Sequence, residues 1–147
     1  RIIEIGSYVG ESTLMFSKHF KEVISVDPYV NDYDLNDMAC SYAPFDKVYQ
    51  QFLRNTLPIH NIKSIRDTSQ NALSILKEQD WDLVYIDGLH TLEGVWFDIE
   101  NYKTIIKPNG FICGHDYGWG NVRHAIGQLL GDRVDNTFKD HSWAKQI

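Results

Sequence analysis

Four polar side chains that could do chemistry follow two apolar runs of the sequence. Asp87 and His90 come just after one run, and His115 and Asp116 come just after another. Two carboxylates and an imidazole can hold a divalent metal ion with open coordination positions, and such an ion lowers the pKa of a bound hydroxyl group. Imidazole also titrates near neutral pH and can remove a proton from a substrate. The four residues indicate a metal site, an acid–base site or, in the simplest interpretation, ordinary polar groups in loops.

A second set of residues lies at the start of the chain. Glu4, Gly6 and Gly10 have the spacing acidic-x-Gly-x-x-x-Gly, between a β-branched run and the start of a helix. A strand, a glycine turn and a helix bring bare backbone close to a ligand at the carboxyl edge of a sheet. Tyr8 stands where a dinucleotide fingerprint has its middle glycine, and no lysine of the triphosphate-binding type follows. The pattern indicates either a site for a positively charged ligand or an ordinary strand-to-helix turn.

Further polar residues end two other apolar runs. Asp27 lies about 20 residues beyond the glycines, where an acidic residue holds a ribose diol in nucleotide-binding sheets. Asp67, Ser69 and Gln70 follow the run 62–65. These small polar groups could hydrogen-bond the edge of an adenine, or they could cap the next helix.

These side chains can meet only if the strands that precede them run parallel. Apolar runs of strand length alternate with helical patterns along the whole chain, which predicts a three-layer α/β/α sandwich with a mostly parallel sheet. The predicted strands are 2–5, 22–27, 62–65, 81–86 and 111–114, and the predicted helices are 11–20, 46–56, 72–78, 91–106 and 122–130. Residues 107–110 are predicted to form a turn. We expect 133–138 and 142–147 to form an antiparallel hairpin at the sheet edge.

Composition narrows the class of protein. The 147 residues predict a single domain spanning 1–147, and a net charge of −6 argues against a nucleic-acid partner. No apolar run approaches the roughly 20 residues that span a bilayer, so we expect no membrane partner. Cys40 and Cys113 lie far apart, which favours free thiols and a cytoplasmic location. Because Arg1 lies directly beside a predicted core strand, we expect further residues to precede it.

Taken together, these motifs resemble those of the class I S-adenosylmethionine (SAM) methyltransferases. The match is closest to the small Rossmann-like O-methyltransferases with Ile-Asp-Gly-x-His and Gly-His-Asp-Tyr motifs, found here at 86–90 and 114–117. The chain is also similar to the catechol-type and the macrolide- or sugar-type metal-dependent O-methyltransferases. The resemblance covers almost the whole chain. It implies a Rossmann-like fold, SAM as cofactor, and methyl transfer to a hydroxyl oxygen of a small molecule such as a sugar, a polyketide or a phenol.

The resemblance also implies roles for individual residues. The residues that match cofactor contacts are Glu4, Gly6, Ser7, Gly10, Ser12, Asp27, Asp67, Ser69, Gln70 and Asp87. His90 falls where these families keep a catalytic base, with Asp87 as its catalytic partner, and Asp87, His115 and Asp116 match the metal ligands. The families place a carboxylate where this chain has His115. Because magnesium prefers oxygen ligands, a softer ion such as manganese, iron or zinc, or no metal at all, also stays open.

Other functions stay open at this point. The alternatives are an NAD-dependent oxidoreductase, a non-catalytic SAM-binding module and a metal-dependent hydrolase. The long irregular segment 29–46 mixes aromatic and acidic residues, and it forms either a lid or a solvated loop. We expect Tyr29, Tyr33, Tyr42 and Trp119 to wall the pocket of the methyl acceptor. Whether the protein forms a homodimer is also left open.

Overall fold

The computed structural model describes the chain except for residues 36, 39, 41–43, 78–79 and 132–133. In this part of the chain, seven strands form one sheet in the order β3-β2-β1-β4-β5-β7-β6. The strands are β1 (Ile2–Ile5), β2 (Val23–Val26), β3 (Ile62–Ile65), β4 (Trp81–Ile86), β5 (Ile106–Gly114), β6 (Asn136–Thr137) and β7 (Trp143–Gln146). Strands β1 to β5 run parallel, whereas β7 is antiparallel to both β5 and β6. The predicted C-terminal edge hairpin is confirmed.

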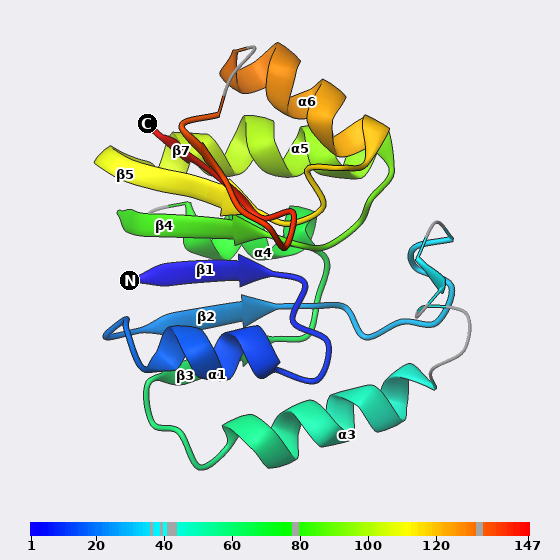
Figure 1. The fold of residues 1–147 in the computed structure, drawn as a ribbon. Helices are drawn as coiled ribbons and strands as arrows, with labels where there is room; N and C mark the ends of the chain where they lie inside the picture. Colours follow the sequence, from blue (N-terminus) through cyan, green and yellow to red (C-terminus); the bar gives the residue numbers. More distant parts are fainter. Residues whose placement is uncertain (36, 39, 41–43, 78–79, 132–133) are drawn as a thin grey trace.

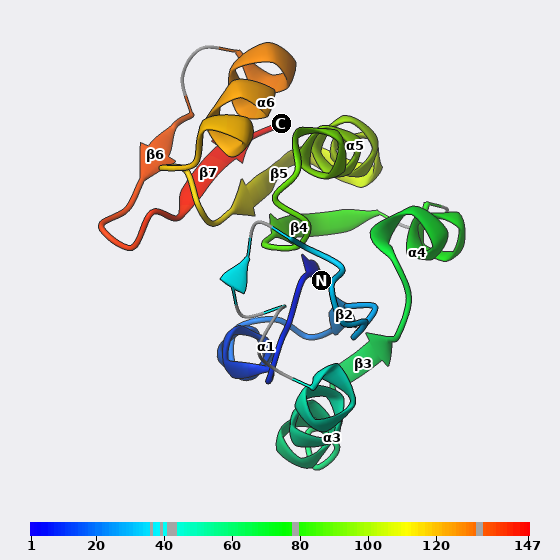
Figure 2. The same ribbon diagram turned by 90° about the vertical axis from the view of Figure 1, so that its right-hand side faces the viewer.

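Helices cover both faces of the sheet. They are α1 (Glu11–Ser17), α3 (Phe45–Thr56), α4 (Ser69–Leu76), α5 (Leu92–Tyr102), the short 3-10 helix η1 (Lys103–Ile105) and α6 (Gly120–Leu130). Figure 2 shows α4, α5 and α6 on one face, with α1 and α3 on the other side. The predicted three-layer sandwich is therefore confirmed. No helix in the described part of the chain has the length and apolar character needed to cross a bilayer.

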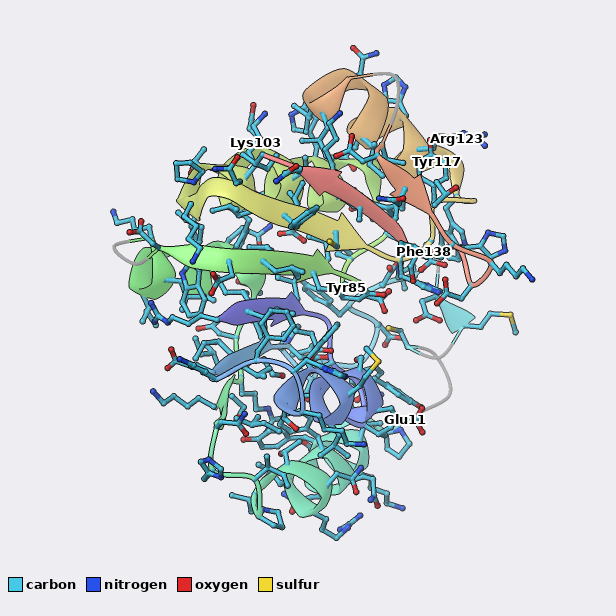
Figure 3. The ribbon with its side chains drawn as sticks, turned by 60° about the vertical axis from the view of Figure 1, so that its left-hand side comes forward. Glu11, Tyr85, Lys103, Tyr117, Arg123 and Phe138 are labelled. Atoms are coloured by element: carbon cyan, nitrogen blue, oxygen red, sulfur yellow. The ribbon has the colours of Figure 1, made fainter. Side chains whose placement is uncertain are left out.

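The two parallel strands β1 and β2 are buried on both faces of the sheet, whereas the edge strand β3 is half-buried to exposed. All four residues of β1 and of β2 are buried, as expected for strands covered by helices on each side. On the α5 face, Trp81, Ile99, Tyr102 and Ile112 are fully buried in one apolar cluster. On the α1 face, Tyr85 of β4, which is labelled in Figure 3, packs against Phe16 with 5.1 Å between ring centroids.

The parallel strands all end at one level. In the strand pairing, Ile5 lies opposite both Val26 and Ile86, Val26 lies opposite Ile65, and Ile86 lies opposite Gly114. The carboxyl ends of these strands therefore share one edge of the sheet, and the loops that follow them meet there (Figure 1). This edge is where open α/β sheets bind ligands.

The predicted helix end at residue 106 and the predicted turn at 107–110 are wrong. Helix α5 stops at Tyr102, and β5 already begins at Ile106, which pairs with Trp81. The buried side chain of Ile106 anchors this pair. The Pro-Asn-Gly sequence bends the strand instead of reversing it, because Asn109 adopts a φ of 66° and the register shifts between Trp81 and Leu83. A turn signature within a strand thus produced an irregularity in the ladder.

Other boundaries shift by a few residues. Helix α4 begins at Ser69 instead of 72, because the Thr68 side chain accepts a hydrogen bond from the Asn71 backbone and caps the helix there. Helix α1 ends at Ser17, three residues before its predicted end.

Candidate functional site

A cavity of about 230 Å³ lies at the carboxyl edge of β1, β2 and β4. Its lining includes the residues that directly follow these strands, together with residues of the segment after β2. Among the predicted cofactor residues, those that line it are Gly6, Ser7, Ser12, Asp27, Ser69 and Asp87. Glu4, Gly10, Asp67 and Gln70 are not part of the lining.

The glycine turn lets two strand exits lie against each other. Gly6 has a φ of +82°, and a Cβ placed on it would lie 1.9 Å from the backbone oxygen of Asp87. Only glycine fits this combination of conformation and contact. Gly10 caps α1 in the left-handed conformation at a φ of +88°. Gly6 is therefore required by the close approach of the β1 and β4 exits.

Glu4 lies beneath this turn and supports it. The side chain is fully buried, and its two oxygens accept hydrogen bonds from the hydroxyls of Ser12 and Thr13 at the start of α1. Burial raises the pKa of Glu4 to about 7, against the lowering effect of the two hydroxyls. Glu4 reaches the cavity only through Ser12, which lines it. The predicted direct contact of Glu4 with a cofactor remains a prediction.

Asp27 connects the β1 turn to the exit of β2. Its carboxylate accepts hydrogen bonds from the backbone N–H groups of Ser7 (3.0 Å), Tyr8 (3.1 Å) and Tyr29 (2.9 Å). Burial raises the pKa of Asp27, while these three donors lower it. A carboxylate can accept about four hydrogen bonds, so one acceptor position of Asp27 remains, and the residue lines the cavity.

The residues after β3 divide between the two roles considered for them. Asp67 accepts hydrogen bonds from the Thr68 backbone (2.7 Å) and the Asn71 side chain (2.8 Å) at the start of α4, and Gln70 is exposed. Ser69 is buried and lines the cavity. The helix-capping interpretation therefore accounts for Asp67, whereas Ser69 stays available to a ligand.

His90 is surrounded by carboxylates. Its Nδ1 lies 2.7 Å from Asp34 Oδ2, and its Nε2 lies 2.8 Å from Asp116 Oδ2 and 3.9 Å from Asp87 Oδ1. The Trp119 ring packs beside it at 4.7 Å between centroids. Burial lowers the pKa of His90, but the carboxylates of Asp87, Asp34 and Asp116 outweigh that effect and raise the pKa to about 9. The ring is an imidazolium ion at neutral pH in this arrangement.

Asp34 was not singled out in the sequence. It comes from the segment after β2, is 2% exposed, and also accepts a hydrogen bond from the His90 backbone N–H at 2.7 Å. One acid among several in an irregular segment carries no signal of a partner 56 positions away. The described part of this segment does lie over the cavity, since Tyr33, Asp34, Asp37 and Cys40 line it.

The expected aromatic wall is only partly formed. Tyr33 lines the cavity, but Tyr29 is buried against Tyr49 and Phe52, and its hydroxyl lies 2.9 Å from Ser7 Oγ. Trp119 contacts His90 and does not line the cavity itself. Tyr42 lies outside the described residues.

One group of possible metal ligands overlaps the predicted trio in Asp87 and Asp116. Asp87, His90 and Asp116 each offer a ligand atom within 4.8 Å of the others. The predicted ligand His115 lies next to this trio, with its Nδ1 3.9 Å from Asp87 Oδ1 and 3.3 Å from Asp116 Oδ1. Burial lowers the pKa of His115, and the charges of Asp87 and Asp116 raise it above its ordinary value. Two carboxylates and an imidazole suit a first-row transition ion better than magnesium.

Asp98 is a second cavity residue that sequence reasoning missed. It lies on α5, is 1% exposed, and its Oδ1 has no hydrogen-bond partner. Burial raises its pKa to about 7, and the Ser69 hydroxyl partly opposes this. Its position was readable in the sequence: it lies three residues after Val95 and four before Tyr102, which places an acid on the buried stripe of the helix.

This fold, with a glycine turn after β1 and an acid after β2 around one cavity, is that of the class I SAM-dependent methyltransferases. The family model described as Methyltransferase domain matches residues 3–117, and the chain belongs to this family. The resemblance noted from the motifs is thereby confirmed.

Solved structures show the same fold at low sequence identity. CalS11, a TDP-rhamnose 3'-O-methyltransferase of calicheamicin biosynthesis, has a TM-score of 0.64 at 14% identity, covering 99% of this chain and 70% of that one. The O-methyltransferase NovP has a TM-score of 0.69 at 13% identity, covering 99% and 70%. The N-methyltransferase NodS from Bradyrhizobium japonicum WM9, in complex with S-adenosyl-L-homocysteine (SAH), has a TM-score of 0.62 at 15% identity, covering 99% and 76%. No curated protein sequence matches the chain significantly.

Proposed function

We propose that this protein transfers the methyl group of SAM to a hydroxyl oxygen of a small molecule. The observation that carries the proposal is the division of one cavity between two kinds of residue. Asp27 and Ser69 line it from the β2 and β3 side of the sheet, where a nucleoside fits. Asp87, His90 and Asp116 line it from the β4 and β5 side, where a proton can be removed. The similar proteins CalS11 and NovP are O-methyltransferases, which supports oxygen as the acceptor atom.

Positioning is the first task of the residues in this cavity. The cofactor, when bound, supplies an electrophilic methyl group on a positively charged sulfur, which the acceptor oxygen attacks with loss of its proton. Asp27 offers its remaining acceptor position to the ribose hydroxyls, and the Gly6 turn leaves the backbone open beside it. Holding both reactants in line contributes much of the rate enhancement in such displacements.

His90 is placed to handle the acceptor proton. Because Asp34 contacts Nδ1, only Nε2 is left to take part in the reaction. With a pKa of about 9, that nitrogen carries a proton at neutral pH, so the ring must first lose this proton before Nε2 can either accept the proton of the acceptor or ligate a metal ion. It cannot do both at once. The donor atoms of Asp87, His90 and Asp116 fit an ion, which would supply Lewis acidity to the acceptor hydroxyl. Activity that survives excess EDTA would assign His90 the proton, and activity lost to EDTA and restored by manganese would assign it the ion.

Calorimetric titration with SAH tests the proposal. We expect the wild-type protein to bind SAH and not NADH, because Tyr8 replaces the glycine that a dinucleotide needs. Asp27→Asn should weaken SAH binding about tenfold, the effect of removing a hydrogen bond to a charged acceptor. Binding of NADH without binding of SAH would overturn the proposal in favour of an oxidoreductase.

A further inference from the structure

The unpartnered oxygen of Asp98 lies in the wall of the cavity. A carboxyl group that is 1% exposed normally has both of its oxygens hydrogen-bonded, and leaving one unpaired costs about 1–3 kcal/mol. Asp98 Oδ1 is the one such buried side-chain atom among the residues that the structure describes. Because Asp98 lines the cavity, a bound molecule can supply the hydrogen-bond partner that Oδ1 lacks.

The surrounding contacts fix Asp98 in this orientation. The Tyr102 hydroxyl donates to the Ser69 backbone oxygen at 2.8 Å, which ties α5 to the first residue of α4. The Ser69 hydroxyl lies close enough to the Asp98 carboxyl to lower its pKa, although Oδ1 has no hydrogen-bond partner. Val95 and Ile99, on either side of Asp98 in α5, are buried in the core, so the helix holds Asp98 on the cavity side. Oδ1 is therefore a preorganised acceptor.

The chemistry of the missing partner follows from the group itself. Above a pH of about 7 the carboxyl is ionised and its oxygens only accept hydrogen bonds, so the partner then must carry an N–H or O–H. Asp27 lies on the neighbouring part of the lining and is the candidate for the sugar hydroxyls, so the part of the nucleoside that reaches the α4–α5 wall is the base. A purine with an amino group at carbon 6 presents a donor there, whereas a purine with a carbonyl presents a second acceptor.

We propose that Asp98 Oδ1 accepts a hydrogen bond from the exocyclic amino group of the nucleoside base and makes the cavity selective for 6-aminopurine nucleosides. This inference rests on the proposed SAM-binding function. It assigns base selectivity to helix α5, in addition to the residues after β3 that the sequence motifs indicated.

The test compares two ligands that differ at this one group. SAH and S-inosylhomocysteine, its 6-oxo counterpart, are titrated calorimetrically at a pH of about 8.5, where the carboxyl is ionised. We expect the wild-type protein to prefer SAH at least about tenfold, because the oxo group would face the carboxylate oxygen. Asp98→Asn should bring the ratio of the two affinities close to one, since an amide can present either a donor or an acceptor.

Asp27→Asn is the matched control. It should weaken both ligands by the same factor and leave their ratio unchanged, because it acts on the sugar. Equal affinity of the wild-type protein for the two ligands would overturn the inference while leaving the proposed function intact. Failure to bind SAH at all would overturn the proposed function and the inference together. If Asp98→Asn does not fold, the wild-type ratio alone decides.

Discussion

Carboxylates contact both ring nitrogens of His90. Such an arrangement costs free energy and is unusual in a surface loop, but it is common in a reactive site. Asp34 fixes the ring through Nδ1 and also through the backbone N–H, so the direction of Nε2 is set before any ligand arrives. Asp116 and Asp87 then share the space in front of Nε2. Such preorganisation is what proton transfer or metal ligation requires.

Replacement of His90 separates catalysis from cofactor binding. His90→Ala should slow methyl transfer about a hundredfold or more, because the group that handles the acceptor proton is gone. SAH affinity, measured by calorimetry, should stay within about twofold of the wild type, since the nucleoside groups are on the other side of the cavity. His124→Ala, on an exposed position of α6, is the control and should change neither quantity. If His90→Ala transferred methyl groups at the wild-type rate, His90 would have no catalytic role.

Asp98 gives a prediction about stability and pH. An unfolded aspartate ionises near 3.8, but folded Asp98 holds its proton until the pH approaches about 7. Between these values the folded state binds more protons, so the contribution of Asp98 to the free energy of unfolding falls as the pH rises. Asp98→Asn removes this loss. We expect the variant to be more stable than the wild type by about 1–3 kcal/mol at pH of about 8, with the difference vanishing near pH 4.

Urea unfolding at the two pH values measures this difference. Glu4, whose pKa is also raised to about 7, titrates in both proteins and cancels in the comparison. Asp32→Asn, at an exposed position, serves as the control and should leave the pH profile unchanged. A variant less stable than the wild type at the higher pH would contradict the cost assigned to the buried carboxylate.

At the level of elements, the sheet brings together residues that are far apart in the sequence. The alternation of apolar runs and helical stripes was enough to predict five parallel strands and their shared carboxyl edge, because a helix between two strands requires a parallel crossover. The same reasoning placed Asp27, Asp87 and Asp116 at strand ends on that edge, and all three line the cavity. It failed at 106–110, where the local turn signature of Pro108 and Gly110 was overridden by the pairing of Ile106 with Trp81.

Two parts of the site could not be read from local patterns. Asp34 comes from an irregular segment, and nothing in the residues around it fixes where that segment folds back. Whether His90 or the predicted His115 is placed to share a ligand with Asp87 and Asp116 depends on side-chain directions after two strands, which spacing alone does not give. Asp98 differs from both. Helical periodicity places it on the buried face of α5, and an acidic residue on that face already indicates a site residue.

The turn after β1 should be the least tolerant backbone position near the site. Gly6→Ala combines a left-handed φ with a contact of 1.9 Å to the Asp87 backbone oxygen, so β1 and β4 would have to separate. We expect a loss of about 3 kcal/mol or more in the free energy of unfolding, measured by urea denaturation. Gly127→Ala, in α6 with no atom within 4 Å of the added Cβ, should instead gain about 0.5–1 kcal/mol. Equal effects at the two glycines would contradict this account.

Over the whole molecule, the cavity lies where loops from both halves of the parallel sheet meet. Gly6 lies at the centre, with the β2 and β3 exits to one side and the β4 and β5 exits to the other. A ligand that contacts both sides would add a link between segments that the strand pairing and the His90–Asp34 contact already join. Ligand binding should therefore stabilise the fold as a unit.

Thermal unfolding measures that coupling. A ligand present at a hundred times its dissociation constant adds about 2.7 kcal/mol to the free energy of unfolding when it binds only the folded state. For a chain of this size, that increment corresponds to a rise in Tm of about 5–10 °C. We expect SAH to produce such a shift in the wild type, a smaller one at the same concentration in Asp27→Asn, and none when NADH replaces SAH. Because the shift scales with affinity, equal shifts in the wild type and in Asp27→Asn would mean that this carboxylate does not contact the nucleoside, and the placement of the ribose at the β2 exit would have to be abandoned.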